Sequence, residues 1–306
     1  MSNNPVSQHY VPACYLREFA DPKDGFLWIF SKDGKKVRRQ KPEKVFTCKH
    51  LYTINIKGTN DYCIEQTLSD IEYNYAEIFQ NKIKKKIPLT EQDHAILCVF
   101  VAAQLQRTLR MKKNQENFIQ QIIEHGQQIA KVHGGNFEQK QEWELYKKNI
   151  HKLQLMEGLP YLVNILYQMN IAFICSSDPQ KHWFITSDDP CVLFNQDLQW
   201  QRFYGPGLGQ KNVQLTMPLS PEITVLFCWA NYRGYSFGRI RVVEEMINRM
   251  TRACCDKEFV SPSSSKKKIW FNKVPRDLMF LFKVIVSETR LFLHDFKTNR
   301  KQYKHK

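Results

Sequence analysis

Hydrophobic residues follow three patterns along the chain, and the first covers residues 1–60. Two apolar runs, FLWIF (26–30) and VFTCKHLYTINI (45–56), flank KDGKKV (32–37), which contains an Asp-Gly pair. Short runs rich in β-branched and aromatic residues around such a pair are typical of strands joined by a tight hairpin. We therefore expect residues 1–60 to form strands.

Apolar residues recur at helical spacing from residue 61 to about residue 170. The first helix is expected to bury one stripe, made of Ile64, Leu68, Ile71, Tyr75, Ile78 and Phe79. Thr90 and Asp93 form a variant of the capping box, so a second helix should begin there. The run that follows is apolar on nearly all sides, which predicts a central position within a helical block over 61–170.

After residue 170 the pattern again predicts strands, separated by Asp-Pro, Gly-Pro and Ser-Pro pairs. The expected strands are IAFIC (171–175), HWFITS (182–187), VQLTMPL (213–219) and ITVLFCWA (223–230). One helix is expected at 241–255, a last strand or helix within 283–296, and a basic tail at 297–306.

These patterns predict an α+β fold, in which the helical block packs with a mostly antiparallel β-sheet. The strands before residue 61 need partners from the β-rich part 171–296, so neither half is self-sufficient. We expect one unit over residues 1–296 instead of two independent domains.

Composition narrows the class of protein. Aromatic residues make up 13% of the 306 residues, which excludes a disordered chain. No run approaches the roughly 18–20 apolar residues of a membrane-spanning helix, and MSNNPVSQHY lacks the layout of a secretion signal. The nine cysteines are odd in number and lie mostly in apolar runs, as reduced buried thiols do. We expect a cytoplasmic protein.

The formal net charge of +15 favours an acidic partner, either nucleic acid or an anionic membrane. Lys35 and Arg38, in the basic run KKVRRQK, are candidate substrate-binding residues because cations neutralise phosphates. Other basic runs are KIKKK (82–86) and SKKK (265–268). The alternative is a solvated basic surface, so nucleic-acid binding and a protein partner both stay open.

Several motifs occur in the order and spacing of a known family. They are QHYVPACYLREFA at the start, FLWIFSKDG, CIEQTLSDIE, AAQLQRTLR, WFITSDDPCVLF, MPLSPEITVLF, and an Asn248 helix leading to FVSP. Over residues 8–262 the chain therefore resembles the bacterial and fungal family called domain of unknown function 4238. The resemblance implies a shared fold unit and no settled activity. Scattered members look like genes that travel with phage-defence loci, which implies a defence or toxin effector.

His9, Glu65 and Glu72 are the first candidates for chemistry. A histidine that titrates near neutral pH suits a general acid, a general base or a metal ligand, and the alternative is a structural histidine. Glu65 and Glu72 are seven residues apart, so they lie on one helix face, about 10 Å apart at the backbone. They could share a divalent cation or divide acid and base roles, or they could pair with arginines of the next helix.

Gln104, Arg107 and Arg110 continue the most buried helix. A buried arginine needs a negative partner, because an unpaired buried charge is very unfavourable. Glu65 or Glu72 could supply the carboxylate. The functional alternative is a phosphate of the substrate, which a guanidinium binds bidentately.

Asp188 and Asp189, in ITSDDPCV (185–192), end an apolar strand. Acids at a strand end, joined by Glu72, could hold Mg²⁺ or Mn²⁺ for phosphodiester cleavage. The alternative is an Asp-Pro turn, in which the aspartate oxygens accept nearby backbone N–H groups.

Together these residues predict a nucleic-acid-directed hydrolase, an RNA or DNA nuclease. Its expected catalytic residues are His9, Glu65, Arg107 and Asp188, with Arg110, Gln104, Lys35 and Arg38 binding the substrate. The alternative is a non-catalytic module that binds nucleic acid or a protein, in which the same side chains form a buried polar network.

Overall fold

The computed structural model describes residues 6–272, apart from 57, 177, 196, 200–204 and 238–240. It confirms the α+β class. The chain divides into two compact units, each built from two separate stretches. Unit 1 consists of Met1–Arg17 and Gln40–Tyr167, and unit 2 of Glu18–Arg39 and Gln168–Lys306. A single folding unit over residues 1–296 stays a prediction.

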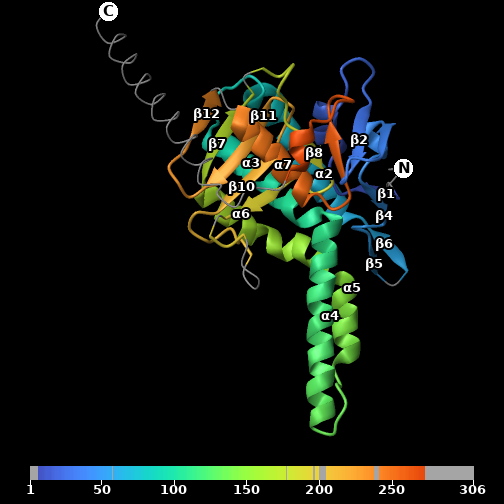
Figure 1. Ribbon diagram of the computed structural model, residues 1–306. Coiled ribbons are helices and arrows are strands. Elements are labelled where there is room, and N and C mark those ends of the chain that lie inside the picture. Colours follow the sequence, from blue (N-terminus) through green and yellow to red (C-terminus); the bar gives the residue numbers. More distant parts are fainter. Residues whose placement is uncertain are drawn as a thin grey trace, which may run out of the picture. The chain divides into compact units, whose positions relative to one another are not determined.

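Unit 1 contains the helical block expected from about residue 61 to residue 170 (Figure 1). Its helices are α1 (Ala13–Leu16), α2 (Cys63–Ile78), α3 (Glu91–Arg107), α4 (Leu109–Val132), α5 (Lys140–Leu153) and α6 (Leu159–Gln168), which ends at the unit boundary. Its strands form two antiparallel pairs, β1 (Ser7–His9) with β4 (Thr47–Lys49) and β5 (Ile54–Ile56) with β6 (Thr59–Asp61).

Helix α3 is the most buried helix of unit 1, as its apolar run predicts. Residues 100–108 are all buried. The expected capping box is present, because the Thr90 hydroxyl accepts from the Asp93 N–H at 3.2 Å and the Asp93 carboxylate accepts from the Thr90 N–H at 2.9 Å. The α2 stripe faces inward, and Ile64 and Leu68 pack with Ala103 of α3.

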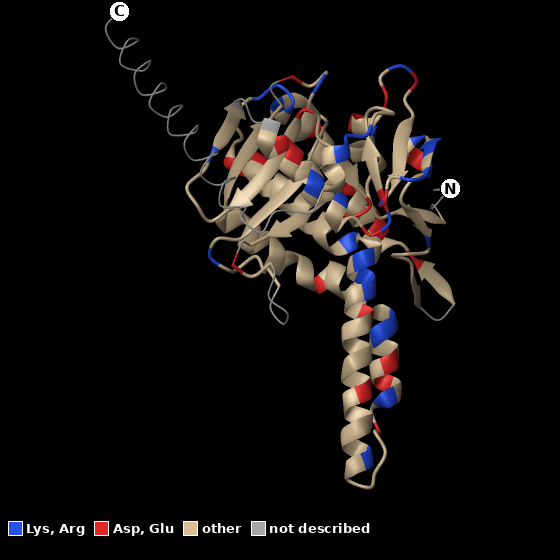
Figure 2. Cartoon of the chain, in the orientation of Figure 1, with Lys and Arg blue, Asp and Glu red and all other residues tan. Residues whose placement is uncertain are grey.

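Helices α4 and α5 form an antiparallel hairpin (Figure 1). Ile119 and Ile123 of α4 pack against Ile150 of α5 between the two helices. The chain turns at Gly134, whose φ of +73° is one that glycine adopts without strain. Lys and Arg residues gather near the start of α4 (Figure 2).

Unit 2 contains two larger sheets. The five-stranded sheet has the order β12 (Gly234–Phe237), β7 (Asn170–Cys175), β11 (Ile223–Cys228), β10 (Gln214–Pro218) and β9 (Val192–Phe194). The four-stranded sheet has the order β3 (Val37–Gln40), β2 (Leu27–Ser31), β13 (Glu258–Ser261) and β8 (Thr186–Ser187). Strand β12 runs parallel to β7, whereas β13 is antiparallel to both β2 and β8. Of the strands before residue 61, β2 thus pairs with a strand beyond residue 170, whereas β1, β4, β5 and β6 pair among themselves.

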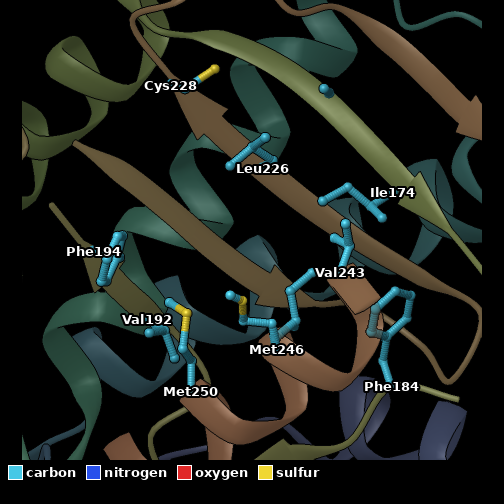
Figure 3. Packing of buried hydrophobic residues seen from close by; sticks show 11 residues of the cluster. Ile174, Phe184, Val192, Phe194, Leu226, Cys228, Val243, Met246 and Met250 are labelled. Carbon is cyan, nitrogen blue, oxygen red and sulfur yellow. The ribbon is translucent and has the colours of Figure 1, made fainter. Parts of the chain in front are cut away.

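Helix α7 (Arg241–Cys254) matches the helix expected at 241–255 and packs on the five-stranded sheet. Its apolar residues recur at helical spacing, so they share one face. Figure 3 shows three of them, Val243, Met246 and Met250, in a buried cluster with strand residues such as Leu226 and Val192.

Asn248 of α7 explains why HWFITS (182–187) is only partly a strand. Its side chain is fully buried, accepts from the Ile185 N–H at 2.9 Å and donates to the Trp183 carbonyl at 2.7 Å. These backbone groups therefore bond to a side chain, and strand β8 is confined to Thr186–Ser187.

Two other expectations need correction. The strands lie in four sheets among the described residues instead of one. VFTCKHLYTINI (45–56) forms two strands, β4 and β5, because His50, directly after β4, takes a positive φ of 51° and turns the chain. The expected element at 283–296 and the tail at 297–306 lie outside the described residues.

In the part of the chain that the structure describes, no helix combines the length and the apolar character needed to cross a membrane.

Candidate functional site

Arg107, the last residue of α3, lies at the centre of a buried polar cluster in unit 1. Its side chain is 2% exposed. Nη1 donates to the Glu72 carboxylate of α2 at 2.8 Å, and Nη2 donates to the His9 carbonyl at the end of β1 at 2.6 Å. Arg107 therefore pairs with one of the two carboxylates that the sequence offered, and it also holds the N-terminal strand.

The opening motif of the chain is attached to α3 at two successive carbonyls. One turn before Arg107, the Gln104 side chain donates to the Tyr10 carbonyl at 3.0 Å. Residues three apart on a helix lie on one face, so Gln104 and Arg107 together contact the His9–Tyr10 backbone. The structure thus joins the HYVP motif to the AAQLQRTLR motif.

Tyr52 completes the cluster, although sequence reasoning did not single it out. Its fully buried hydroxyl donates to the Arg107 carbonyl at 3.0 Å and lies 3.3 Å from the His9 carbonyl. The last carbonyls of a helix have no partner within the helix, and Tyr52 supplies one. Burial raises the pKa of Tyr52 well above its ordinary value, so the hydroxyl stays protonated. Its only signal in the sequence was a position inside an apolar run.

The charges around Arg107 shift the pKa values of its neighbours. Burial raises the pKa of Glu65 from 4.5 to about 6. Two nearby charges make smaller contributions: Arg107 lowers the pKa and Glu72 raises it. Burial lowers the pKa of His9 below 6.5, against a hydrogen bond to the Pro42 carbonyl and the charge of Glu72. Burial disfavours the charged form of Arg107 too, but the attraction of Glu72 outweighs it and raises the pKa of Arg107.

Four buried polar atoms of this cluster have no hydrogen-bond partner among the described residues. They are Nε2 of His9, Oε2 of Glu65, Oε1 of Gln104 and Nε of Arg107. Buried polar atoms are almost always paired in proteins, so such a group is typical of a site that binds water or a ligand. Two of the atoms belong to the candidate acid and base, Glu65 and His9.

Asp188 lies in unit 2 and is 5% exposed, at the end of strand β8. Its Oδ1 accepts from the Asp256 N–H at 2.8 Å, and its Oδ2 accepts from the Lys257 and Glu258 N–H groups at 2.7 and 3.0 Å. Burial raises the pKa of Asp188, against the effect of these three bonds. These contacts favour the structural alternative, in which the aspartate oxygens accept backbone N–H groups. The N–H groups belong to the segment that enters β13 and not to the Asp-Pro turn.

The remaining expected residues are Arg38, Lys35 and Asp189 in unit 2 and Arg110 in unit 1. Arg38 binds Glu258 in a fork, with Nε–Oε1 and Nη2–Oε2 distances of 3.1 and 2.8 Å. The Lys35 side chain is 83% exposed. Asp189 is half-buried in unit 2, and Arg110 is half-buried in the first turn of α4. No three His, Cys, Asp or Glu side chains gather as a metal site among the residues that the structure covers.

A second charged group lies in unit 2. Glu244 of α7 is 3% exposed, and its Oε1 lies 3.9 Å from His182 Nδ1 and 3.8 Å from Lys267 Nζ. Lys267 Nζ also lies 4.8 Å from the centre of the Trp183 ring. A glutamate in the first turn of an amphipathic helix gave no signal of this group, because acidic residues are common there.

The model of the family described as Protein of unknown function (DUF4238) matches residues 7–265. The chain belongs to this family. The DUF4238 span runs from β1 to β13, so it covers parts of both units and all the expected catalytic residues, His9, Glu65, Arg107 and Asp188. No curated protein and no solved structure matches the chain.

Proposed function

We propose that this protein is a hydrolase acting on nucleic acid, with Glu65 as general acid and His9 as general base. The observation that supports it is a carboxyl group and an imidazole with oppositely shifted pKa values, both influenced by the same Arg107–Glu72 pair. Burial favours the neutral form of both groups, so a protonated carboxyl can donate a proton and an uncharged imidazole can accept one. Each of the two side chains also has a buried polar atom without a partner among the described residues.

In this mechanism the neutral His9 accepts the proton of the attacking hydroxyl or water, and the protonated Glu65 donates a proton to the leaving oxygen. Arg107 is a positioning residue, because Glu72 and the His9 carbonyl occupy both of its Nη atoms. The net charge of +15 supports an anionic substrate, with nucleic acid the commonest for a chain this basic. We also expect the protein to use Mg²⁺ or Mn²⁺, and the cleavage assay below tests this by comparing each metal with a chelator.

We place this activity in the cytoplasm, as a nuclease of the defence or toxin type. All nine cysteines are free, which suits a reducing compartment. Burial raises the pKa of Cys98 to about 12, so this thiol stays protonated and unreactive.

The test is cleavage of labelled RNA, single-stranded DNA and duplex DNA, with Mg²⁺, with Mn²⁺ and with a chelator. We expect Glu65→Gln to lower the cleavage rate about 100-fold without lowering the melting temperature, because a positioned proton donor contributes on that order. Glu77→Gln is the matched control, since Glu77 is an exposed glutamate on the same helix. The wild-type rate should fall as pH rises through about 6, where Glu65 loses its proton.

A specific observation favours a second candidate, a non-catalytic binding module. The polar atoms of Arg107 and Asp188 are largely occupied by internal contacts that connect strands and helices. In that case the wild-type protein binds labelled nucleic acid or a protein partner but cleaves no substrate under any metal condition. A cleavage rate that is unchanged in Glu65→Gln would also contradict the proposal, because Glu65 would then not be the general acid.

A further inference from the structure

Helix α4 has a second apolar stripe next to the one that packs against α5, and Ile122 lies where the two meet, because it also packs on the cluster of Ile119, Ile123 and Ile150. The stripe contains Phe118, Ile122, Ile129 and Val132, with His125 in the remaining position, so the steps are four, three, four and three residues. This is the heptad spacing of helices that pack against a partner along their length. Phe118, Ile129 and Val132 are 62%, 61% and 82% exposed, so the stripe lies on the surface of unit 1.

A groove of about 520 Å³ lies beside this stripe, between the two helices. It is lined by Phe118, Ile119, Ile122, Glu142, Trp143 and Tyr146. Phe118 and Ile122 belong to the stripe, and Trp143 and Tyr146 belong to α5, so the groove and the stripe form one apolar face. A helix laid into such a groove would extend the hairpin to a bundle.

The charges of the hairpin separate along its length. The inner half, residues 109–117 and 147–153, has six Lys or Arg residues and one Glu. The outer half, residues 123–144, has four Glu residues and two Lys. Residues 118–122, at the middle of α4, are uncharged. The basic start of α4 can be followed in Figure 2.

We propose that two copies of this chain pair through their hairpins, antiparallel, as a four-helix bundle. In a two-fold pairing centred on Phe118 and Ile122, the basic inner half of each copy lies along the acidic outer half of the other. A parallel pairing would bring like charges together, which is unfavourable. The apolar face argues against nucleic acid as the occupant, because phosphates are bound by cations and not by aliphatic side chains.

The test is the mass of the full chain in solution, by sedimentation velocity over a range of micromolar concentrations. We expect a dimer whose dissociation constant rises at least about tenfold in Phe118→Glu, since a central aromatic contact is replaced by a charge. Tyr73→Glu is the matched control, because Tyr73 is 68% exposed on α2, outside the hairpin. A monomeric wild type, or a dimer unchanged by Phe118→Glu, overturns the proposal.

The orientation has a test of its own. Arg110 stands eight residues before Phe118, and Glu142 lines the groove toward the outer end. Arg110→Glu should weaken the dimer, and Glu142→Arg in the same chain should restore part of the loss. A dimer weakened further by the second change would exclude the antiparallel arrangement. Circular dichroism of each variant checks that the helices persist.

Discussion

Arg107 is a buried charge whose neighbours include both helices and strand residues. The guanidinium of Arg107 donates to one carboxylate and one backbone carbonyl in place of water. The backbone carbonyl of Arg107 accepts from the Tyr52 hydroxyl. Such a pair is weak evidence for stability as a whole, because desolvation of the two charges offsets much of their attraction. Removing one partner is different, since the other charge then stays buried alone.

The first prediction concerns this pair. Arg107→Met should lower the free energy of unfolding by about 3–5 kcal/mol, because Glu72 loses its counter-charge and the His9 carbonyl loses its donor. Glu72→Gln should destabilise less, since an amide oxygen still accepts from Nη1. Urea unfolding of both single variants and the double variant measures the coupling. Strictly additive effects would show that the contact contributes nothing.

The second prediction concerns Glu65 and pH. Its folded-state pKa of about 6 lies above the ordinary value of 4.5, so the folded state binds the proton more tightly than the unfolded state. The stabilising effect of this proton is complete below pH 4.5 and is lost as pH rises through about 6. Relative to wild type, Glu65→Gln should therefore gain stability as pH rises from 4.5 to 6. The measurement is the difference between the two urea-unfolding profiles, which cancels the other carboxylates, and a flat difference would contradict the prediction.

At the scale of elements, single polar side chains decide where strands and helices end. Asn248 of α7 bonds the 183–185 backbone and limits β8, and Asp188 at the end of β8 gathers the amides that lead into β13. Both are long-range contacts, so no local pattern could reveal them. The capping box at Thr90 is the opposite case, since both partners lie within four residues.

The third prediction tests the role of Asp188. Asp188→Asn should destabilise the protein by about 2–3 kcal/mol, because an amide nitrogen would face backbone N–H groups that lose an acceptor. Activity per folded molecule should be unchanged. Thermal unfolding monitored alongside the cleavage assay separates the two effects. A stable variant without activity would instead restore Asp188 to the catalytic residues that the sequence suggested.

At the scale of the whole molecule, the chain path connects the two units. Glu18–Arg39 belongs to unit 2 but is flanked on both sides by segments of unit 1, so neither unit is a continuous stretch. Its strand β2 pairs with β13, more than 200 residues later. The net charge of +15 is likewise a sum over the whole chain. The positive residues are unevenly distributed, and one place where they concentrate is the inner half of the α4–α5 hairpin.

The fourth prediction is that the two units unfold together. Among the described tryptophans, Trp28, Trp183, Trp229 and Trp270 lie in unit 2 and Trp143 in unit 1, whereas the longest helices lie in unit 1. Tryptophan fluorescence and far-UV circular dichroism thus report mainly on different units. We expect coincident midpoints in urea, because each unit needs both of its stretches. Two separated midpoints would show independent domains and contradict the single unit over 1–296.

The sequence by itself determined the α+β class, the helical block, the capping box at Thr90 and the helix at 241–255. These features depend on periodicity and on residues a few positions apart, which a single chain displays directly. It also offered Glu72 as a partner for Arg107, but only as one of several. The tertiary structure decided what depends on distant segments: the contact of Arg107 with the His9 carbonyl, the part played by Tyr52, the amides bound by Asp188 and the division of the strands among sheets. Hydrophobic spacing specifies which face of an element is buried, whereas the partner of a buried polar group depends on which distant segment folds beside it.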